Sequence, residues 1–272
     1  MSGFVGDELK RRDTSLPGNV RTVMSYHSLL AETVTFGGHN GDTGDAYYAR
    51  PTRDGKFPGM VVIHHLPGWD EWIIEVARKF AHHGYATIAP HLYFRNGPGS
   101  PDDIGARVRA AGGVADDQVV GDVAGAMAFL RAQPNSFRKI GLIGFCSGGR
   151  HAYLSACRLV SVDAIVDCWG GNVIVDDKSQ LNAKRPMAPI DLTENLGCPL
   201  LGLFGNDDEN PNPDQVNRTE AVLKGLGKPY EFYRYDGAGH AFFNTARISY
   251  RPEQAADGWA KVFKFLKTHL TA

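Results

Sequence analysis

RKIGLIGFCSGGRH, residues 138–151, places one cysteine between an apolar run and a segment that can form a helix. The apolar run, residues 139–145, predicts a short strand that is buried on both faces. Cys146 and three small residues follow it, and residues 150–159 can then form the helix. A strand, a sharp turn with a nucleophile and a helix are typical of a nucleophile elbow, here with cysteine where G-x-S-x-G has serine.

Two glycines support this interpretation of Cys146. Gly144 and Gly148 flank it and approach each other where the chain reverses, so side chains there would collide. We expect Cys146 to have a strained backbone and its thiol to lie at the amino end of a helix, where a thiolate is favoured. The alternative is an inert buried cysteine, which is the common state of a free cysteine. The strand–turn–helix context argues against that alternative here.

The composition is that of an ordinary globular chain, with 272 residues, of which 43% are apolar and 22% charged. The formal net charge of −1 gives no indication of binding to nucleic acid or to an anionic membrane. No apolar run approaches the roughly 20 residues that span a bilayer, and the N-terminal stretch lacks the apolar core of a secretory signal. We therefore expect a cytoplasmic protein without nucleic-acid or membrane partners, and the sequence leaves a homo-oligomer open.

The other cysteines do not suggest a second kind of site. A disulfide framework or a C-x-x-C motif would need a different spacing from that of Cys146, Cys157, Cys168 and Cys198. The paired histidines at 64–65 and 82–83 and His91 have no cysteine or carboxylate at ligand spacing, so we predict no metal site. The glycines at 144–149 lack the G-K-[ST] of a phosphate-binding loop. We also predict no cofactor.

Predicted strands and helices alternate along the chain, which indicates a mostly parallel sheet with helices on both faces, an α/β fold. The predicted strands are 32–36 and 45–50 (a hairpin), 60–64, 85–90, 139–145, 163–171, 199–205 and 230–235. The predicted helices are 71–83, 116–132, 150–159, 214–226 and 252–269. We expect residues 1–30 to be an arm that packs on a single domain, 31–272. Residues 91–115 predict a loop that lines the site or a short polar helix, and residues 172–195 predict an irregular excursion.

A nucleophile needs a base and an orienting acid, and enzymes with this elbow have them in the order nucleophile, acid, histidine. The acid candidates follow the strand at 199–205, and the G-x-x-D spacing favours Asp208 over Asp207. The alternative is that both carboxylates cap the next helix. His240 follows the last strand, in Y-D-G-A-G-H-A-F-F-N, and is the predicted base rather than a structural histidine.

The oxyanion hole is expected to consist of two backbone N–H groups. One is that of Ser147, directly after the nucleophile, and the other lies after an early strand, where we favour Leu66. Aromatic residues near predicted carboxyl ends of strands either wall an apolar pocket or belong to the core. These residues are Trp69, Trp72, Tyr93 and Trp169.

The segments G-F-C-S-G-G, G-N-D-D-E-N-P and Y-D-G-A-G-H-A-F-F-N resemble the dienelactone hydrolase (carboxymethylenebutenolidase) family of α/β-hydrolases. The resemblance extends over about residues 30–270. It implies an eight-stranded, mostly parallel sheet and a triad in which Cys146 attacks, His240 is the base and Asp208 orients it. It also implies hydrolysis of a small ester or lactone through a thioester, without a cofactor.

Two positions depart from the family pattern. Where well-studied members have a glutamate after the early strand, this chain has His65, which would stabilise a thiolate as an imidazolium or line the pocket. Of the two family arginines that hold the substrate carboxylate, Arg95 matches the first, whereas Asn244 stands at the second. These departures make a less anionic ester or lactone at least as good a candidate as dienelactone. They also keep open a non-enzymatic ligand-binding protein, and Cys146 itself keeps open a redox thiol.

Overall fold

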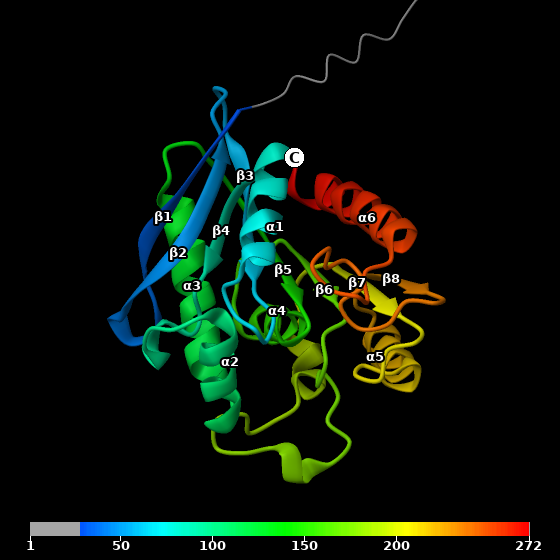
Figure 1. Ribbon diagram of the computed structural model, residues 1–272. Helices are drawn as coiled ribbons and strands as arrows, with labels where there is room; N and C mark the ends of the chain where they lie inside the picture. The colour runs from blue at the N-terminus through cyan, green and yellow to red at the C-terminus, as the bar shows by residue number, and fades with distance from the viewer. Residues whose placement is uncertain (1–27, 272) are drawn as a thin grey trace, which may run out of the picture.

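The computed structural model describes residues 28–271 and contains the predicted sheet of eight strands (Figure 1). The strands are β1 Leu29–Gly37, β2 Thr43–Pro51, β3 Phe57–Ile63, β4 Ala86–Pro90, β5 Ser136–Phe145, β6 Ala164–Cys168, β7 Leu200–Gly205 and β8 Tyr230–Tyr235. Their order in the sheet is β1-β2-β4-β3-β5-β6-β7-β8. β2 pairs antiparallel with β1 and with β4, and all other pairs are parallel. This confirms the predicted fold class.

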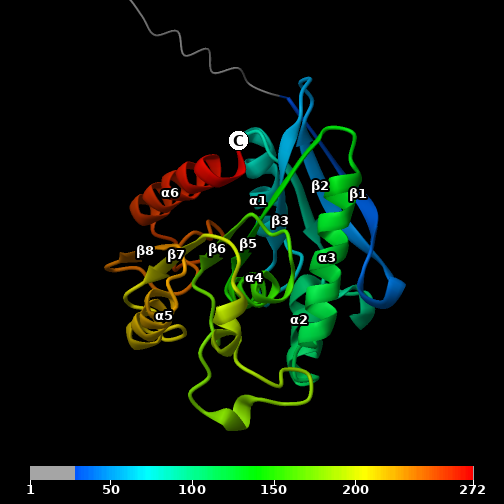
Figure 2. The same cartoon turned by 180° about the vertical axis from the view of Figure 1, so that it is seen from behind.

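Helices cover both faces of the sheet, and each face has its own apolar cluster. The helices are α1 Glu71–His82, α2 Pro101–Ala110, α3 Asp116–Ala132, α4 Ser147–Arg158, α5 Pro213–Gly225 and α6 Pro252–Leu270. One cluster joins the sheet to α1 and α6. The other joins it to α3 and α4 (Figures 1 and 2). The core is therefore double, and the central strands are buried on both sides.

Local signals in the sequence set the helix boundaries. The Asp70 side chain accepts the N–H of Ile73 and begins α1, and Ser100 accepts the N–H of Asp103 before Pro101 at the start of α2. At α5, Asn212 and Gln215 form a reciprocal capping box. These side chains satisfy N–H groups that a helix start leaves without partners.

The structure defines the two segments outside the predicted strands and long helices, residues 91–115 and 172–195. Residues 91–115 contain α2, so the short polar helix forms. Residues 172–195 lack α-helix and strand but contain two 3₁₀ turns, Lys178–Gln180 and Pro189–Asn195. This excursion leaves β6 and passes below α2 at the bottom of Figure 1. Most of the predicted arm, residues 1–27, lies outside the described residues, and its last residues already belong to β1.

Candidate active site

The turn at Cys146 has the strained geometry that the glycines predicted. Cys146 has φ 56° and ψ −121°, between the end of β5 and the first turn of α4. A Cβ on Gly144 would lie 1.9 Å from the carbonyl oxygen of Gly148, so only glycine fits at that point. Cys146 donates its N–H to Cys168 O at 3.0 Å, which ties the turn to β6. Neighbouring elements thus hold the residue in a conformation that side chains normally avoid.

Asp208 and His240 meet at the carboxyl end of the sheet, beside Cys146. Nδ1 of His240 lies 2.8 Å from Oδ2 of Asp208. Burial alone would lower the pKa of His240, but its hydrogen bonds to Asp208 and Cys146 raise that pKa to about 10. The imidazole is therefore held in its protonated form at neutral pH, between a carboxylate and a sulfur.

Asp208, and not Asp207, is the carboxylate that reaches His240. The Asp208 side chain is 2% exposed and its Oδ1 accepts the N–H of Asn210 at 2.9 Å. Asp207 is exposed and holds the loop through its backbone N–H, which donates to Ala238 O. The capping role at α5 belongs to Asn212 instead. Asp208, which the spacing favoured over Asp207, is therefore the carboxylate that contacts His240.

A cavity of about 480 Å³ opens over these residues. Leu66 and Ser147 line it, as expected for residues whose N–H groups form an oxyanion hole. Ser147 is the first residue of α4, and the N–H groups of a first helical turn have no acceptor within the helix. The full lining is Leu66, Arg109, Cys146, Ser147, Arg150, Gly171, Asn172, Arg185, Asp208, Glu209, Asn210 and His240.

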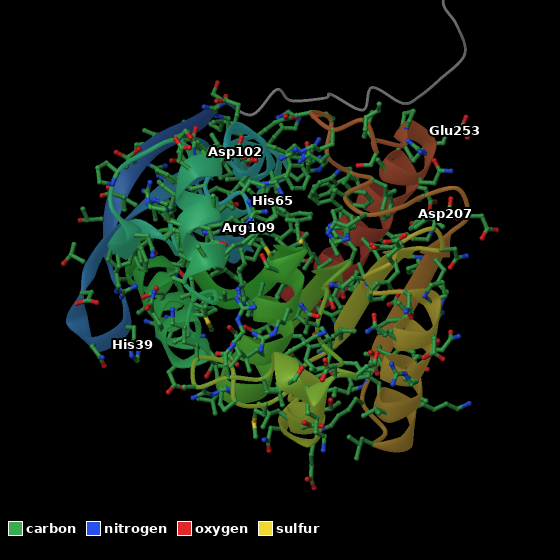
Figure 3. All side chains as sticks on the ribbon, turned by 60° about the horizontal axis from the view of Figure 1, so that its bottom comes forward. His39, His65, Asp102, Arg109, Asp207 and Glu253 are labelled. Atoms are coloured by element: carbon green, nitrogen blue, oxygen red, sulfur yellow. The ribbon has the colours of Figure 1, made fainter. Side chains whose placement is uncertain are left out.

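Three arginines in this lining come from three different segments. Arg150, on α4, is buried and forms a bidentate ion pair with Asp116, with N···O distances of 2.6 and 3.0 Å. Arg109 lies on α2 and is exposed (Figure 3), and Arg185 lies on the excursion and is half-buried. One side of the cavity is therefore cationic, and Arg150 is neutralised there by its own partner.

The sequence of the chain matches a known protein family. Residues 45–270 match the model of the dienelactone hydrolase family. The chain belongs to the dienelactone hydrolase family. A protein of Methylorubrum extorquens with the provisional name carboxymethylenebutenolidase is 35% identical over 222 residues, 80% of this chain and 74% of that protein. A provisional carboxymethylenebutenolidase of Escherichia coli K12 is 33% identical over 234 residues, 84% of each chain.

A solved structure agrees with this assignment. A provisionally named dienelactone hydrolase from Klebsiella pneumoniae superposes with a TM-score of 0.81 at 29% identity. The superposition covers 89% of this chain and all of that one. The chain is thus a hydrolase of the dienelactone hydrolase family, with the fold that the resemblance implied.

Arg95, predicted to hold a substrate carboxylate, does not line the cavity that contains Cys146. Its guanidinium binds Asp122 through two hydrogen bonds of 2.8 and 3.0 Å and Asp42 through one of 2.6 Å. It also donates to the carbonyl of His39, at the outer edge of the molecule in Figure 3. In this structure Asp122, on α3, occupies the donors that a substrate carboxylate would need, and the role of Arg95 in binding substrate stays a prediction.

His65 and Tyr93 are also absent from the cavity lining. Nε2 of His65 lies 2.7 Å from Oδ2 of Asp70, the residue that caps α1. The Tyr93 ring packs edge-on against His64, with centroids 4.5 Å apart, and burial raises its pKa to about 12. His65 thus supports the loop that carries Leu66, whereas the Tyr93 hydroxyl lies near Ser147 and Cys146, beside the cavity.

Trp169 and Asn244 lie behind His240 and are likewise not in the lining. Trp169 is 1% exposed, and its ring packs against Phe242 and Phe243 with centroids 4.9 and 5.2 Å apart. Asn244 is 1% exposed and its Oδ1 accepts the N–H of Ala246. The core-packing alternative is therefore correct for Trp169, and Asn244 shapes the turn after His240.

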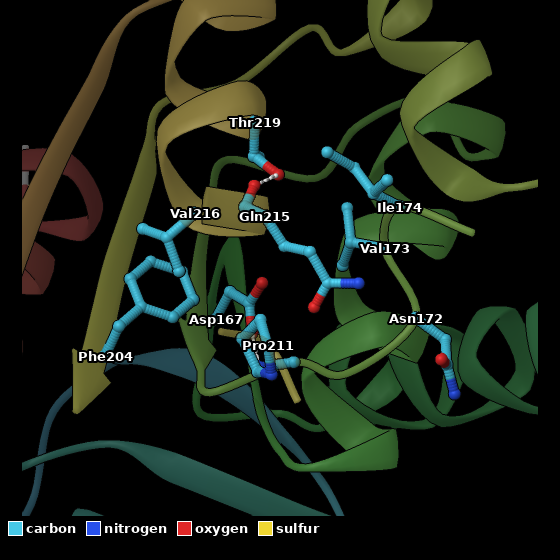
Figure 4. Close-up of a pocket in the computed structure, with 10 residues that line it drawn as sticks. Asp167, Asn172, Val173, Ile174, Phe204, Pro211, Gln215, Val216 and Thr219 are labelled. Carbon is cyan, nitrogen blue, oxygen red and sulfur yellow. Dashed lines mark hydrogen bonds between the residues drawn. The ribbon is translucent and has the colours of Figure 1, made fainter. Parts of the chain in front are cut away.

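A second, much smaller cavity lies at the junction of β6 and α5. It measures about 10 Å³, and Asp167 contributes its carboxylate to the lining (Figure 4). The Asp167 side chain accepts a hydrogen bond, 2.8 Å long, from the N–H of Gly170. Burial raises the pKa of Asp167 to about 7, and the Gly170 N–H only partly offsets this. The volume is that of a single water molecule, so this cavity has no room for a substrate.

No group of three or more His, Cys, Asp or Glu side chains within residues 28–271 is placed to hold a metal ion. No helix in that range has both the length and the apolar character needed to cross a membrane.

Proposed function

We propose that the protein hydrolyses small lactones or esters with Cys146 as nucleophile and a thioester as intermediate. One observation supports this above all: His240 bridges the Asp208 carboxylate and the Cys146 sulfur at the wall of a cavity large enough for a small molecule. Membership of the dienelactone hydrolase family supports a lactone or ester as substrate.

In the proposed reaction, the Cys146 sulfur attacks the carbonyl carbon, and the negative charge that develops on its oxygen is met by the N–H groups of Leu66 and Ser147. His240 then gives its Nε2 proton to the leaving alkoxide, and the C–O bond breaks as the thioester remains. A water molecule transfers a proton to His240 and attacks the thioester. The C–S bond then breaks, the carboxylic acid leaves, and the Cys146 thiolate and the protonated His240 are restored, so no cofactor takes part.

Asp208 has an orienting role in this scheme. Its hydrogen bond to Nδ1 directs the other ring nitrogen of His240 toward the sulfur, and its charge stabilises the imidazolium. The strained backbone conformation of Cys146 presents the sulfur at the amino end of α4, where a thiolate is favoured.

The test is turnover of 4-nitrophenyl acetate and of the lactone dihydrocoumarin by wild type and by Cys146→Ala. We expect the variant to lose about 10³-fold or more in kcat, and mass spectrometry to detect a wild-type acyl adduct on Cys146. Cys157→Ala is the matched control, because it removes a buried thiol from the same helix without touching the elbow.

Equal turnover by wild type and Cys146→Ala would overturn the proposal. Ligand binding without any turnover would instead favour a binding protein on this scaffold. Reversible oxidation of Cys146 by peroxide, again without turnover, would favour a redox thiol.

A further inference from the structure

Arg185 is a half-buried cation in the active-site cavity that has no carboxylate partner of its own. Its one hydrogen bond within residues 28–271 is a long one, from Nε to Val114 O at 3.5 Å. The carboxylate whose charge acts on Arg185 is Asp116, and both of its oxygens already bind Arg150. Burial and the charge of Arg150 both lower the pKa of Arg185, so the protein keeps this charge at a cost.

The chain holds Arg185 at this place through several contacts. Nζ of Lys184 donates to the carbonyls of Ala111 and Gly113, at 2.6 and 3.1 Å, directly after α2. The backbone carbonyl of Lys184 accepts the N–H of Asp116 at 2.8 Å. The Asn182 side chain accepts the N–H groups of Lys184 and Arg185. The excursion is thus fastened to α2 and α3 on either side of the guanidinium.

Gly113 leaves the space that the guanidinium fills. A Cβ at this position would lie 2.3 Å from Nη2 of Arg185, and the φ of Gly113 is +87°, in the region that favours glycine. The sequence around residue 113 therefore permits Arg185 to extend into the cavity.

Neither of the two positions where the family has a carboxylate-binding arginine offers a free guanidinium here. Arg95 is bound to Asp42 and Asp122, and Asn244 is buried in its own turn. Within the cavity, Arg150 is neutralised, which leaves Arg185 in the wall and Arg109 at an exposed position.

We propose that Arg185 is a specificity-determining residue, which binds a carboxylate of the substrate that is separate from the ester or lactone group under attack. A guanidinium matches a carboxylate with two parallel hydrogen bonds, and an unpaired one gains most from such a ligand. This inference rests on the proposed function, because it assigns the substrate class of the same site.

The test compares two esters with the same succinyl chain and leaving group that differ in charge: mono-4-nitrophenyl succinate and its neutral methyl ester. For Arg185→Gln we expect kcat/KM for the anionic ester to fall roughly 10- to 100-fold, mainly through KM, while the neutral ester changes less than about threefold. Arg185→Lys keeps the charge without the planar fork and should give an intermediate loss.

The matched control is Arg158→Gln. Arg158 is an exposed arginine that pairs with Asp117 and borders a separate cavity beside Pro186 and Met187. The Arg158→Gln substitution removes one positive charge, as Arg185→Gln does, but outside the active-site cavity. The ratio of kcat/KM for the anionic ester to kcat/KM for the neutral ester should stay as in wild type.

An equal loss for both esters in Arg185→Gln would overturn the inference, since it would mean that Arg185 only supports the loop. An unchanged ratio would overturn it as well. The Cys146 proposal fails on a different result, full activity of Cys146→Ala, and the ester ratio would still report on Arg185 in that case. Thermal unfolding of each variant verifies that the compared proteins are folded.

Discussion

Asp208 and Asp167 are two carboxylates at the carboxyl ends of neighbouring strands, and they are almost equally buried, at 5% and 3% exposure. Asp208 follows β7 and faces the cavity of about 480 Å³, where it binds His240 and accepts the N–H of Asn210. Asp167 lies in β6 and faces the cavity of about 10 Å³, where its one hydrogen bond comes from Gly170 (Figure 4).

The difference between them shows that the partner, and not the depth of burial, decides what a carboxylate does. Asp208 has a cation against it, and the pair raises the pKa of His240. No cation within residues 28–271 pairs with Asp167, so burial raises the pKa of its carboxyl to about 7. We infer that below about pH 7 Asp167 packs as a neutral acid between the first turn of α4 and Gly170, where a Cβ on Gly149 would lie 2.2 Å from its Oδ1.

Removing the charge of Asp208 should have the greatest effect on turnover. In Asp208→Asn, the amide cannot stabilise the imidazolium and its NH₂ group favours the wrong tautomer of His240. We expect kcat for 4-nitrophenyl acetate to fall about 10³- to 10⁴-fold with little change in folding. Asp207→Asn, in the same loop but exposed, should stay within about twofold of wild type. Similar rates for the two variants would remove Asp208 from the triad.

The same substitution at Asp167 should affect stability instead. Between about pH 4 and 7 the unfolded chain has released this proton and the folded protein still holds it, so stability decreases as pH rises, by about 1.4 kcal/mol per pH unit from this group. Asp167→Asn removes that contribution and keeps an acceptor for Gly170. We expect a higher Tm than wild type at pH 8, a smaller difference at pH 5, and kcat within about threefold.

Unfolding curves at pH 5, 6, 7 and 8 for wild type and Asp167→Asn measure this directly. A variant that is less stable than wild type at pH 8 would show that Asp167 is ionised and paired in the fold. A loss of turnover as large as in Asp208→Asn would make Asp167 the acid of the site.

The sequence was sufficient for the fold and for the positions of the three proposed catalytic residues, because each depends on a strand end. The apolar runs before Cys146, Asp208 and His240 are parallel strands whose carboxyl ends meet at one edge of the sheet. Local spacing also decided between Asp207 and Asp208.

The residues that line the rest of the cavity could not be found in this way. Arg109 and Arg185 come from α2 and from an excursion without periodicity, and only the tertiary contacts of Lys184 bring Arg185 to the site. The glycine pair at 112–113 makes room for Arg185 in the structure. The sequence does not show this, because the two segments are far apart in the chain. For Trp169 the sequence left pocket wall and core packing open, because an aromatic residue at a strand end can pack in either direction.

Substitution of Arg95 should give the smallest change in turnover. It tests whether Arg95, which matches a family arginine in sequence, binds the substrate in this protein. The Asp122 side chain is fully buried, and Arg95 neutralises it. In Arg95→Gln this carboxylate keeps the N–H of His39 but loses its cation, so we expect the free energy of unfolding in urea to fall by roughly 3 kcal/mol. The ratio of kcat/KM for mono-4-nitrophenyl succinate and its methyl ester should stay as in wild type.

The double variant Arg95→Gln/Asp122→Asn separates the two roles of Arg95. It removes the stranded charge together with its partner, so part of the lost stability should return, as is common when both members of a buried ion pair are replaced. A selective loss of the anionic ester in both variants would instead return carboxylate binding to Arg95. Arg185 would then share that role with Arg95 or lose it. We do not expect this result, because Arg95 binds Asp122 and Asp42 and does not line the cavity around Cys146.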